Sequence, residues 1–462
     1  MDNDTRTAES LEELLRRGPQ ALAEAIATAR AEDVAEILNR LEPSRAAELV
    51  VAMPFEFAVK VLEHPEFERR DVVVQQLNPE LAAHFIEALA PDQQADLFRE
   101  LPERARTDLL NRIDVRTRVS VQALLRYDPT TAGGLMTTDY VSVSSTWTAR
   151  ETLDHIRHTG RTARPVYAVY VVHPETDRLV SVVSLRELVG ADPNTLVGEI
   201  GERRKIVTVE PDTDREAVAR LIAKYNLLAV PVVSRENRLL GTITVDDVID
   251  AIVKEQTEDV QKIGGMEALD KPYTHIGFAA LIRKRAGWLC ALFLSEMLTA
   301  TAMQHFEVEL SHAIVLSLFI PLIMSSGGNS GSQATSLIIR ALALRELRVR
   351  DWWRTALREL PAGLTLGAIL GVIGAARIAA WQMFGFYDYG PHWPLIAATV
   401  SLALVGVVAF GSLAGAMLPF VLRSLRFDPA SASAPFVATL VDVTGLSIYF
   451  GVAYVILRGT LL

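Results

Sequence analysis

Two long stretches without charged side chains limit most strongly what this chain can fold into. Leu310–Ile339 carries no charge apart from His312, and Tyr389–Leu422 carries none apart from His392. Each stretch exceeds the roughly 20 apolar residues that an α-helix needs to cross a bilayer at about 1.5 Å per residue. We therefore expect the second part of the chain to contain membrane-spanning helices.

The charged residues divide the chain into two parts. Residues 1–270 contain 32 Lys and Arg against 47 Asp and Glu, whereas residues 271–462 contain 14 against 9. This contrast predicts a large acidic part in the cytoplasm followed by a membrane part. The acidic, polar start predicts that no secretory signal peptide is present. Because Cys290 is the only cysteine, an internal disulfide and a Cys-rich zinc site are excluded.

The first 126 residues contain a proline roughly every twelve positions, at Pro43, Pro54, Pro65, Pro79, Pro91 and Pro102. Proline is tolerated in the first turn of a helix but not in its middle. Each unit is therefore predicted to be a helix of about two turns followed by a corner. Such short helices bury their apolar stripes by stacking on one another, so we expect residues 1–126 to form a helical superhelix.

A second repeat follows within residues 127–250. Residues 178–189 match residues 238–249 at an offset of 60, and an apolar strand precedes each copy. The pattern predicts a strand, a turn, a strand and a helix, twice. We therefore expect a pair of small α/β modules.

This pair resembles a tandem of CBS domains, which often bind adenine nucleotides or act as regulatory hinges. The family's nucleotide-side motif is met in the second copy by Gly241, Ile243, Thr244 and Asp247, whereas Ser181 and Glu187 replace its glycine and aspartate in the first copy. The resemblance implies that ATP, if it binds, contacts Thr244 and Asp247.

A connector over residues 251–285 joins the two parts. Its helical pattern runs to Ile263 and breaks at Gly264 and Gly265, and an amphipathic stretch, Ile276–Arg285, follows. Its position between the cytoplasmic part and the membrane part predicts that it transmits movement from one to the other.

The remaining residues, 286–462, are predicted to form five spans, at about 286–306, 311–339, 360–384, 394–422 and 434–457. Lys and Arg precede the first span and occupy the loops after the second and fourth spans, whereas the other two loops lack them. By the positive-inside rule, the basic loops and the N-terminus face the cytoplasm, and the C-terminus lies outside. The expected fold is a multidomain α-helical polytopic membrane protein.

Asp442 is the first unusual residue within the predicted spans, because it lies about two turns into the last one. A carboxylate there costs at least about 2.5–3.5 kcal/mol on insertion scales, so it should face water, a cation or a partner. The alternative is a protonated or helix-bonded aspartate without a role in transport. Thr444 and Gly445 indicate a closely packed surface rather than a lipid-facing one.

The second unusual feature is the polar, glycine-rich segment Ser325–Gln333. We expect a broken helix there, because irregular backbone at membrane depth lines a cavity and its free carbonyl groups coordinate ions or their waters. The alternative is that its glycines only allow helices to pack closely. Two roles are open for Glu296 in the first span. It could pair with a polar group of a neighbouring span, or it could serve an ion pathway.

Three segments, Thr131–Thr137, Pro321–Gln333 and Leu440–Phe450, are similar to those of the MgtE family of magnesium channels and transporters. The similarity covers nearly the whole chain in the same domain order. It implies a homodimer in the plasma membrane, with a pore between the subunits in which Asp442 holds hydrated Mg²⁺.

By the same resemblance, Gly328, Asn329 and Ser332 line the pore. The family often has asparagine at the positions of Ser332 and Ala434, so this pore wall carries less amide oxygen.

The chemistry of Mg²⁺ suits a single carboxylate in a neutral pathway. The ion demands near-octahedral oxygen at about 2.0–2.1 Å and loses water reluctantly, so few carboxylates should recognise its hydrated form. A carrier for soft metals would want Cys or clustered His and Met near the path. Transport of Co²⁺ or Mn²⁺ stays open as an alternative.

A second group of carboxylates indicates regulation of the pore. Such groups repel one another unless cations bridge them. We expect intracellular Mg²⁺ to neutralise them, draw the domains together and move the connector to close the pore. The alternative is a solvated acidic face, and Asn226 stands where the family has a further acidic residue. The predicted regulatory ligands are Asp92, Asp96, Asp214, Glu216, Asp246, Asp247, Asp250, Glu255, Glu258 and Asp259.

Other functions fit the sequence less well. An intramembrane metalloprotease needs a His-Glu-x-x-His motif, which the chain lacks, and we expect no enzymatic activity. A chloride channel is disfavoured by the anionic pathway and by the number of spans, and the acidic cytoplasmic part would repel nucleic acids. A non-conducting receptor that senses cations or nucleotides is the remaining alternative, although a mere anchor needs no charge within the membrane.

Overall fold

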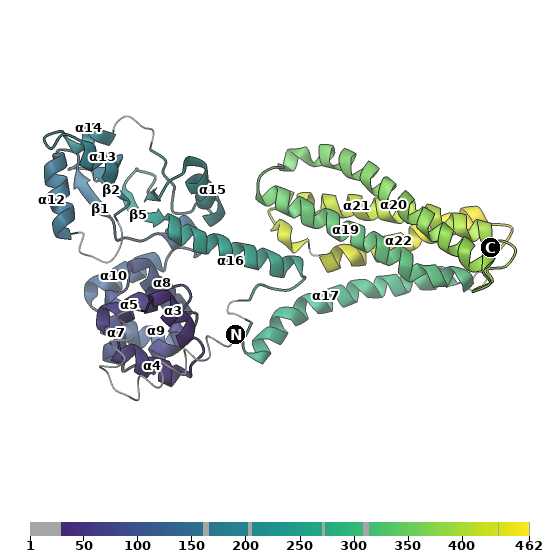
Figure 1. Ribbon diagram of the computed structural model, residues 1–462, viewed down its shortest axis with the longest axis horizontal. Coiled ribbons are helices and arrows are strands. Elements are labelled where there is room, and N and C mark those ends of the chain that lie inside the picture. The colour runs from purple at the N-terminus through teal and green to yellow at the C-terminus, as the bar shows by residue number, and fades with distance from the viewer. Residues whose placement is uncertain are drawn as a thin grey trace. The chain divides into compact units, whose positions relative to one another are not determined.

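The computed structural model describes residues 29–159, 166–201, 206–269, 273–307, 314–432 and 434–461. The chain divides into two compact units, Met1–Lys254 and Glu255–Leu462. Figure 1 labels most of the helices and several of the strands of both.

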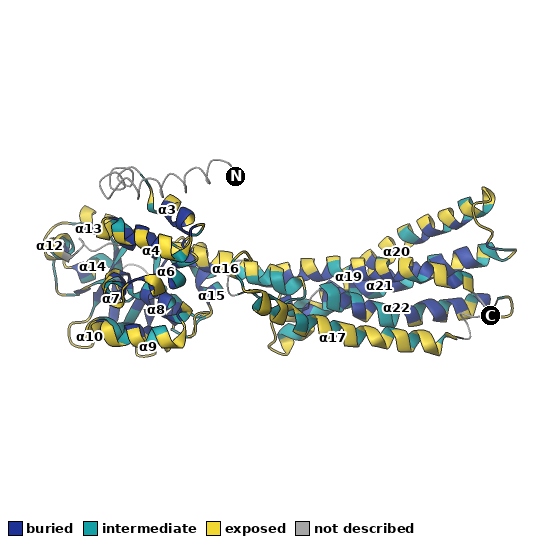
Figure 2. Cartoon of the chain, turned by 90° about the horizontal axis from the view of Figure 1, so that it is seen from below, coloured by how far each residue is buried: buried dark blue, intermediate teal, exposed yellow. Residues whose placement is uncertain are grey.

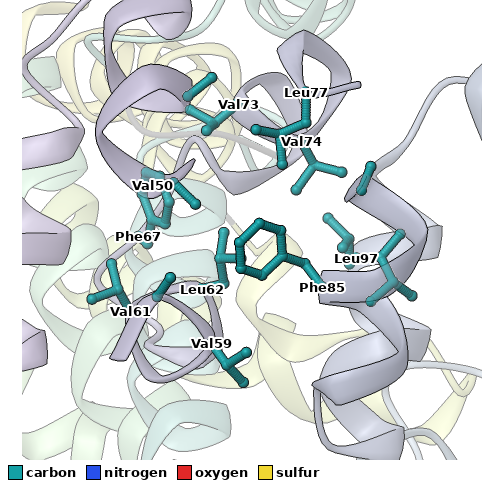
Figure 3. Close-up of a cluster of buried hydrophobic side chains, with 14 of the residues drawn as sticks. Val50, Val59, Val61, Leu62, Phe67, Val73, Val74, Leu77, Phe85 and Leu97 are labelled. Carbon is teal, nitrogen blue, oxygen red and sulfur yellow. The ribbon is translucent and has the colours of Figure 1, made fainter. Parts of the chain in front are cut away.

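Short helices make up the start of the described chain, as the proline repeat predicts. Proline occupies the first turn of α4, α7 and α8. Phe67, Phe85 and Leu97, from different segments of the repeat, meet in one buried cluster (Figure 3). Stacking therefore buries the apolar stripes, and the predicted repeat of short helices is confirmed. The helices are α3 (Ala31–Leu38), α4 (Pro43–Ala52), α5 (Phe55–Glu63), α6 (Arg70–Gln76), α7 (Pro79–Ala88), α8 (Pro91–Glu100), α9 (Glu103–Arg112) and α10 (Val115–Leu124).

Two α/β modules follow, and their strands pair equivalently. In the first, β2 lies between β1, which is parallel to it, and β3, which is antiparallel. In the second, β4 and β5 are antiparallel, with an irregularity at the equivalent place. The predicted strand, strand and helix order is present in both copies. The elements are α11 (Ala132–Leu135), β1 (Val141–Ser144), α12 (Ala149–Thr159), β2 (Ala168–Val172), β3 (Leu179–Ser184), α13 (Leu185–Gly190), α14 (Val197–Gly201), α15 (Arg215–Tyr225), β4 (Ala229–Val233), β5 (Leu239–Thr244) and α16 (Val245–Ile263).

The segment around Gly134 ties the short helices to the modules. The backbone of Gly133 donates to Pro211 at 2.8 Å, and Arg99 donates to the carbonyl oxygen of Gly134 at 3.3 Å. A Cβ atom at Gly134 would lie 2.2 Å from the carbonyl oxygen of Asp128. Only glycine fits this position without moving the backbone.

Replacing Gly134 by alanine is therefore expected to lower the free energy of unfolding by about 1–3 kcal/mol, the usual cost of overpacking. Thermal unfolding of the full-length protein in detergent measures the change. Gly190→Ala is the control, because a Cβ there meets nothing within 4 Å. Equal stability of both variants would contradict the packing argument.

The second unit contains five helices that are long and apolar enough to cross a membrane, counted over its described residues, and this confirms the predicted number. Helix α21 packs against α19, α20 and α22, whereas α17 packs chiefly against α22. Figure 2 shows the resulting contrast between the largely buried α21 and the exposed α17. The elements are α17 (Phe278–His305), η1 (Ile314–Phe319), α19 (Ile320–Ala343), η2 (Val349–Asp351), α20 (Trp352–Met383), α21 (Trp393–Ser424), η3 (Pro429–Ser431) and α22 (Ala434–Leu457).

The predicted break in the glycine-rich segment is wrong, because α19 runs without interruption through Ser325–Gln333. Two of its glycines, Gly327 and Gly331, instead face α21. A Cβ at Gly411 would lie 2.3 Å from the carbonyl oxygen of Gly327, and one at Gly415 would lie 2.2 Å from that of Gly331. Small residues let spanning helices approach closely, and an apolar medium favours intrahelical hydrogen bonds even where glycine weakens a helix in water.

The connector also differs from its expected bounds. Helix α16 ends at Ile263, and Gly265 adopts a positive φ of 75°. Helix α17 already begins at Phe278, so the amphipathic stretch forms the first turns of the first spanning helix rather than a separate element.

Candidate functional site

Polar side chains follow one face of α19. Ser325, Asn329 and Ser336 are exposed on the single chain, and Ser332 is partly exposed. Their spacing of three or four residues places them on the same side of the helix. The amide of Asn329 donates to Ser325 Oγ at 3.4 Å, and Ser332 Oγ donates to the carbonyl oxygen of Gly328 at 2.9 Å. The unbroken helix therefore offers side-chain oxygens rather than free carbonyl groups.

Gly328, which was also predicted to line the pore, does not lie on this polar face. Gly328 is buried, and a Cβ atom there would lie 3.4 Å from Ala438 Cβ of α22. Ser332 Oγ also lies 3.4 Å from the carbonyl oxygen of Ala434. This part of α19 is therefore held against the first turns of the last spanning helix.

Asp442 lies on α22, and its side chain is partly exposed. Its carboxylate forms no hydrogen bond or ion pair with the described residues. The reading in which Asp442 is bonded to its own helix is therefore not supported. An intramembrane carboxylate in this state needs water, a cation or a second subunit.

Glu296 of α17 lies beside Asp442. The rings of Trp288 and Phe436 are 6.4 Å apart, and those of Phe306 and Phe450 are 4.8 Å apart. These contacts join α17 and α22 on both sides of the two carboxylates, which interact electrostatically with each other.

Neither carboxylate has a cationic partner in the part of the chain that the structure describes. The sequence left the role of Glu296 open, and the structure places it beside a second intramembrane carboxylate.

Within the second unit, the end of α16 is held to the loop between α21 and α22 by an ion pair that the sequence did not indicate. Lys262 Nζ lies 2.8 Å from Asp428 Oδ2 and 3.9 Å from Glu258 Oε2. Asp428 Oδ1 also accepts from the backbone of Ala430 at 2.9 Å, which orders the loop between α21 and α22. Burial alone would lower the pKa of Lys262, but the hydrogen bond and charge of Asp428, with Glu258 and Glu255, raise it.

In the short helices, the two predicted carboxylates of α8 lie among arginines. Asp92 is buried, and Asp96 pairs with Arg99 at 2.6 Å. Arg70 pairs with Glu100 at 3.0 Å. Burial raises the pKa of Asp96, although Arg99 and Arg70 oppose this shift. Asp96 therefore already has a cationic partner in this structure.

The predicted carboxylates near α15 also have local partners. Asp214 precedes the helix rather than lying on it, and its Oδ1 accepts from the backbone of Glu216 at 2.9 Å and of Ala217 at 3.3 Å. Glu216 pairs with Arg220 at 2.7 Å. Asp214 thus acts as an N-cap, a role that its position before the helix can reveal in a sequence.

At the start of α16, the motif aspartate forms a cap. Asp247 Oδ2 accepts from the backbone of Thr244 at 3.3 Å and from its hydroxyl group, and the Thr244 side chain is buried. Asp246 lies beside them in the first turn.

Asp250 faces the short helices of the same unit. Burial raises its pKa, Asp246 and Glu66 raise it further, and His64 lowers it. Asp246, from the same helix, and Glu66, from the segment between α5 and α6, thus both repel the charged form of Asp250, which is the situation in which a bridging cation is stabilising.

Glu255, Glu258 and Asp259 lie further along α16, and their spacing to Lys262 places them near one another on the helix. Within the described ranges, no group of three or more His, Cys, Asp and Glu side chains is arranged to hold a metal ion. A complete ion site would therefore need ligands from water, backbone or a second subunit.

Comparisons with known proteins cover most of the chain. Residues 320–452 match a family described as "Divalent cation transporter", residues 29–130 match "MgtE intracellular N domain", and residues 132–194 and 197–254 match "CBS domain".

Relatives of this chain include proteins named magnesium transporter MgtE. The one from Thermus thermophilus is 39% identical over 459 residues, which cover 98% of this chain and 99% of the relative. The one from Enterococcus faecalis is 34% identical over 338 residues, which cover 73% and 72%. A crystal structure of the soluble part of a magnesium transporter matches with a TM-score of 0.50 at 28% identity, and covers 55% of this chain and 99% of that one.

Proposed function

This chain belongs to the MgtE family of magnesium transporters, and from that premise we propose that it carries Mg²⁺ across the plasma membrane through a pore between two identical subunits. The N-terminus is cytoplasmic in this proposal, and the protein performs no enzymatic reaction. The observation that carries the proposal is the intramembrane carboxylate of Asp442, which has no cationic partner among the described residues.

A divalent ion is the natural partner for Asp442. Two copies of the carboxylate, one from each subunit, would attract a hydrated divalent cation in a neutral pathway, and Mg²⁺ keeps most of its waters when it binds to few carboxylates. The side-chain oxygens of Asn329 and Ser332 would accept hydrogen bonds from those waters. The buried Gly328 would act by letting α22 approach α19.

The homodimer is supported by two surfaces that a single chain leaves exposed. The polar face of α19 is unsuited to lipid, because polar groups within the membrane face protein or water. Helix α17 exposes Leu289, Phe293 and Met297, and it shares little surface with the other helices. A second copy that covers the polar face would enclose the pathway.

Regulation by Mg²⁺ follows from the carboxylates of α16 and their neighbours. Cations would relieve the repulsion among Asp246, Asp250 and Glu66 and among the acidic residues near Lys262. The last turns of α16, fixed by the ion pair with Asp428, would then favour a closed pathway. ATP binding at Thr244 and Asp247 is also part of the proposal, with a ribose hydroxyl sharing the capping carboxylate.

Uptake of Mg²⁺ into proteoliposomes that contain the purified protein tests the main proposal. We expect flux that falls when Mg²⁺ is raised on the face carrying the acidic domains. Parallel measurements with Mn²⁺ and Co²⁺ test selectivity. Absence of flux for every one of these ions, from protein that is folded and dimeric, would instead favour a non-conducting receptor.

Replacing Glu296 by glutamine is expected to raise the Mg²⁺ concentration for half-maximal flux by about three- to tenfold, because it removes one of two interacting negative charges. The control is Glu307→Gln, an exposed carboxylate just beyond the end of the same helix. If this concentration rose equally in both variants, or did not change in Glu296→Gln, Glu296 would not be part of the ion pathway.

A further inference from the structure

Arginines at the start of α20 and in the preceding η2 form an exposed basic stripe. Arg350 of η2 and Arg354 and Arg358 of α20 are all exposed, and the four-residue spacing of Arg354 and Arg358 places these two on one face of α20. Their guanidinium groups form no ion pair at contact distance and no hydrogen bond within the described ranges, although Arg358 interacts electrostatically with Glu359. We call these three residues the α20 arginine stripe.

Three other arginines of the second unit are engaged in contacts. Arg423 donates to the carbonyl oxygen of Leu342 at 2.8 Å. Arg377 lies 4.8 Å from the ring of Trp381, and Arg458 lies 5.3 Å from the ring of Tyr454. The positive-inside rule accounts for the sign of the α20 stripe but not for three exposed guanidinium groups that lack partners within the described ranges.

An apolar stripe runs next to the arginines along the same helix. Trp353, Leu357, Leu360 and Leu364 are all exposed and recur at helical spacing from the basic end into the span. Trp352 adds a second exposed ring, 5.5 Å from that of Trp353 in an edge-to-face arrangement. Tryptophan favours the level of the lipid headgroups, so this end of α20 lies at the membrane surface.

The arginines lie on the side of α20 away from the neighbouring helix, and the apolar side chains, although nearer to that helix, are still exposed. Helix α20 packs on α21 through Gly363 and Gly367, where a Cβ atom would lie 2.8 Å from Ala409 Cα and 2.6 Å from Val405 Cα. Helical geometry places Arg354 and Arg358 on the side away from these glycines. A molecule from the surrounding bilayer therefore reaches both stripes.

We propose that this end of α20 binds an anionic membrane lipid, with its headgroup phosphate on the α20 arginine stripe and an acyl chain along Leu357, Leu360 and Leu364. Arginine recognises phosphate through paired, charge-assisted hydrogen bonds. Clusters of basic residues directly beside a spanning helix attract anionic lipids. An acyl chain can cover the adjoining apolar stripe and free phosphate cannot, so a lipid fits this surface better than the free anion does.

Binding of phosphatidylglycerol to the full-length protein, measured by native mass spectrometry, tests the site. The variant Arg350→Gln/Arg354→Gln/Arg358→Gln is compared with Arg283→Gln/Arg285→Gln/Arg426→Gln, which removes the same charge from other exposed arginines. We expect about tenfold weaker binding in the first variant and less than about twofold in the second. Equal losses would overturn the proposal, because net charge alone would then explain binding.

A second measurement compares two lipids on the unmodified protein, and this comparison does not depend on the folding of a variant. Brominated phosphatidylglycerol should quench tryptophan fluorescence more than brominated phosphatidylcholine does, and Trp352→Phe/Trp353→Phe should remove the difference. Equal quenching by the two lipids would overturn the site. Displacement of the lipid by millimolar inorganic phosphate would also overturn it, since the ligand would then be the free anion.

Discussion

Replacing Asp442 by asparagine is expected to reduce Mg²⁺ flux into proteoliposomes by about 10–10³-fold, the range over which charge focusing raises the local concentration of a counter-ion. Asparagine keeps the size and one oxygen of the side chain but removes its charge. In a homodimer both charges disappear from the pathway at once. The apparent affinity for Mg²⁺ should fall as well, because a neutral amide binds the hydrated ion weakly.

The matched control for this experiment is Glu346→Gln, which removes an exposed carboxylate from the segment between α19 and η2. Dimer content and thermal unfolding of both variants should equal those of the unmodified protein, so that a loss of flux reports on the pathway. Full and equally selective flux in Asp442→Asn would exclude this side chain as the pore ligand. Wild-type transport would still support the family function in that case.

The features that were predicted from the sequence depend on local signals. A long stretch without charged residues identifies a spanning helix, whichever helices pack against it. Proline positions also indicate where short helices begin. The repeat at an offset of 60 residues likewise reports two copies of one module. Asp442 stood out for the same reason, because a charge inside an apolar run is unusual wherever the helix packs.

Other features depend on which helices become neighbours, so the sequence could not reveal them. Glycines favour a break in an isolated helix, yet Gly327 and Gly331 allow α19 to approach α21. Glu296 lies near Asp442 only because α17 packs on α22. Lys262 and Asp428 are 166 positions apart in sequence, and nothing local joins them.

Breaking the ion pair between Lys262 and Asp428 is expected to weaken the inhibition of transport by intracellular Mg²⁺. Replacing Lys262 by glutamate places like charges where a 2.8 Å contact now holds α16 to the loop before α22. Ile263 packs in the same place, against the cluster formed by Ile339, Ala430 and Ala432. Repulsion there should release the end of α16 from the membrane unit and weaken closure by intracellular Mg²⁺.

The Mg²⁺ concentration that halves flux is therefore expected to rise in Lys262→Glu, within the 5- to 150-fold range that coupling energies of about 1–3 kcal/mol produce. Adding Asp428→Lys restores an ion pair with reversed signs and should recover most of the inhibition. Lys254→Glu, an exposed position on the same helix, controls for the change in charge. If Lys254→Glu matched Lys262→Glu, or if the reversed pair failed to recover inhibition, the contact would not be part of the gate.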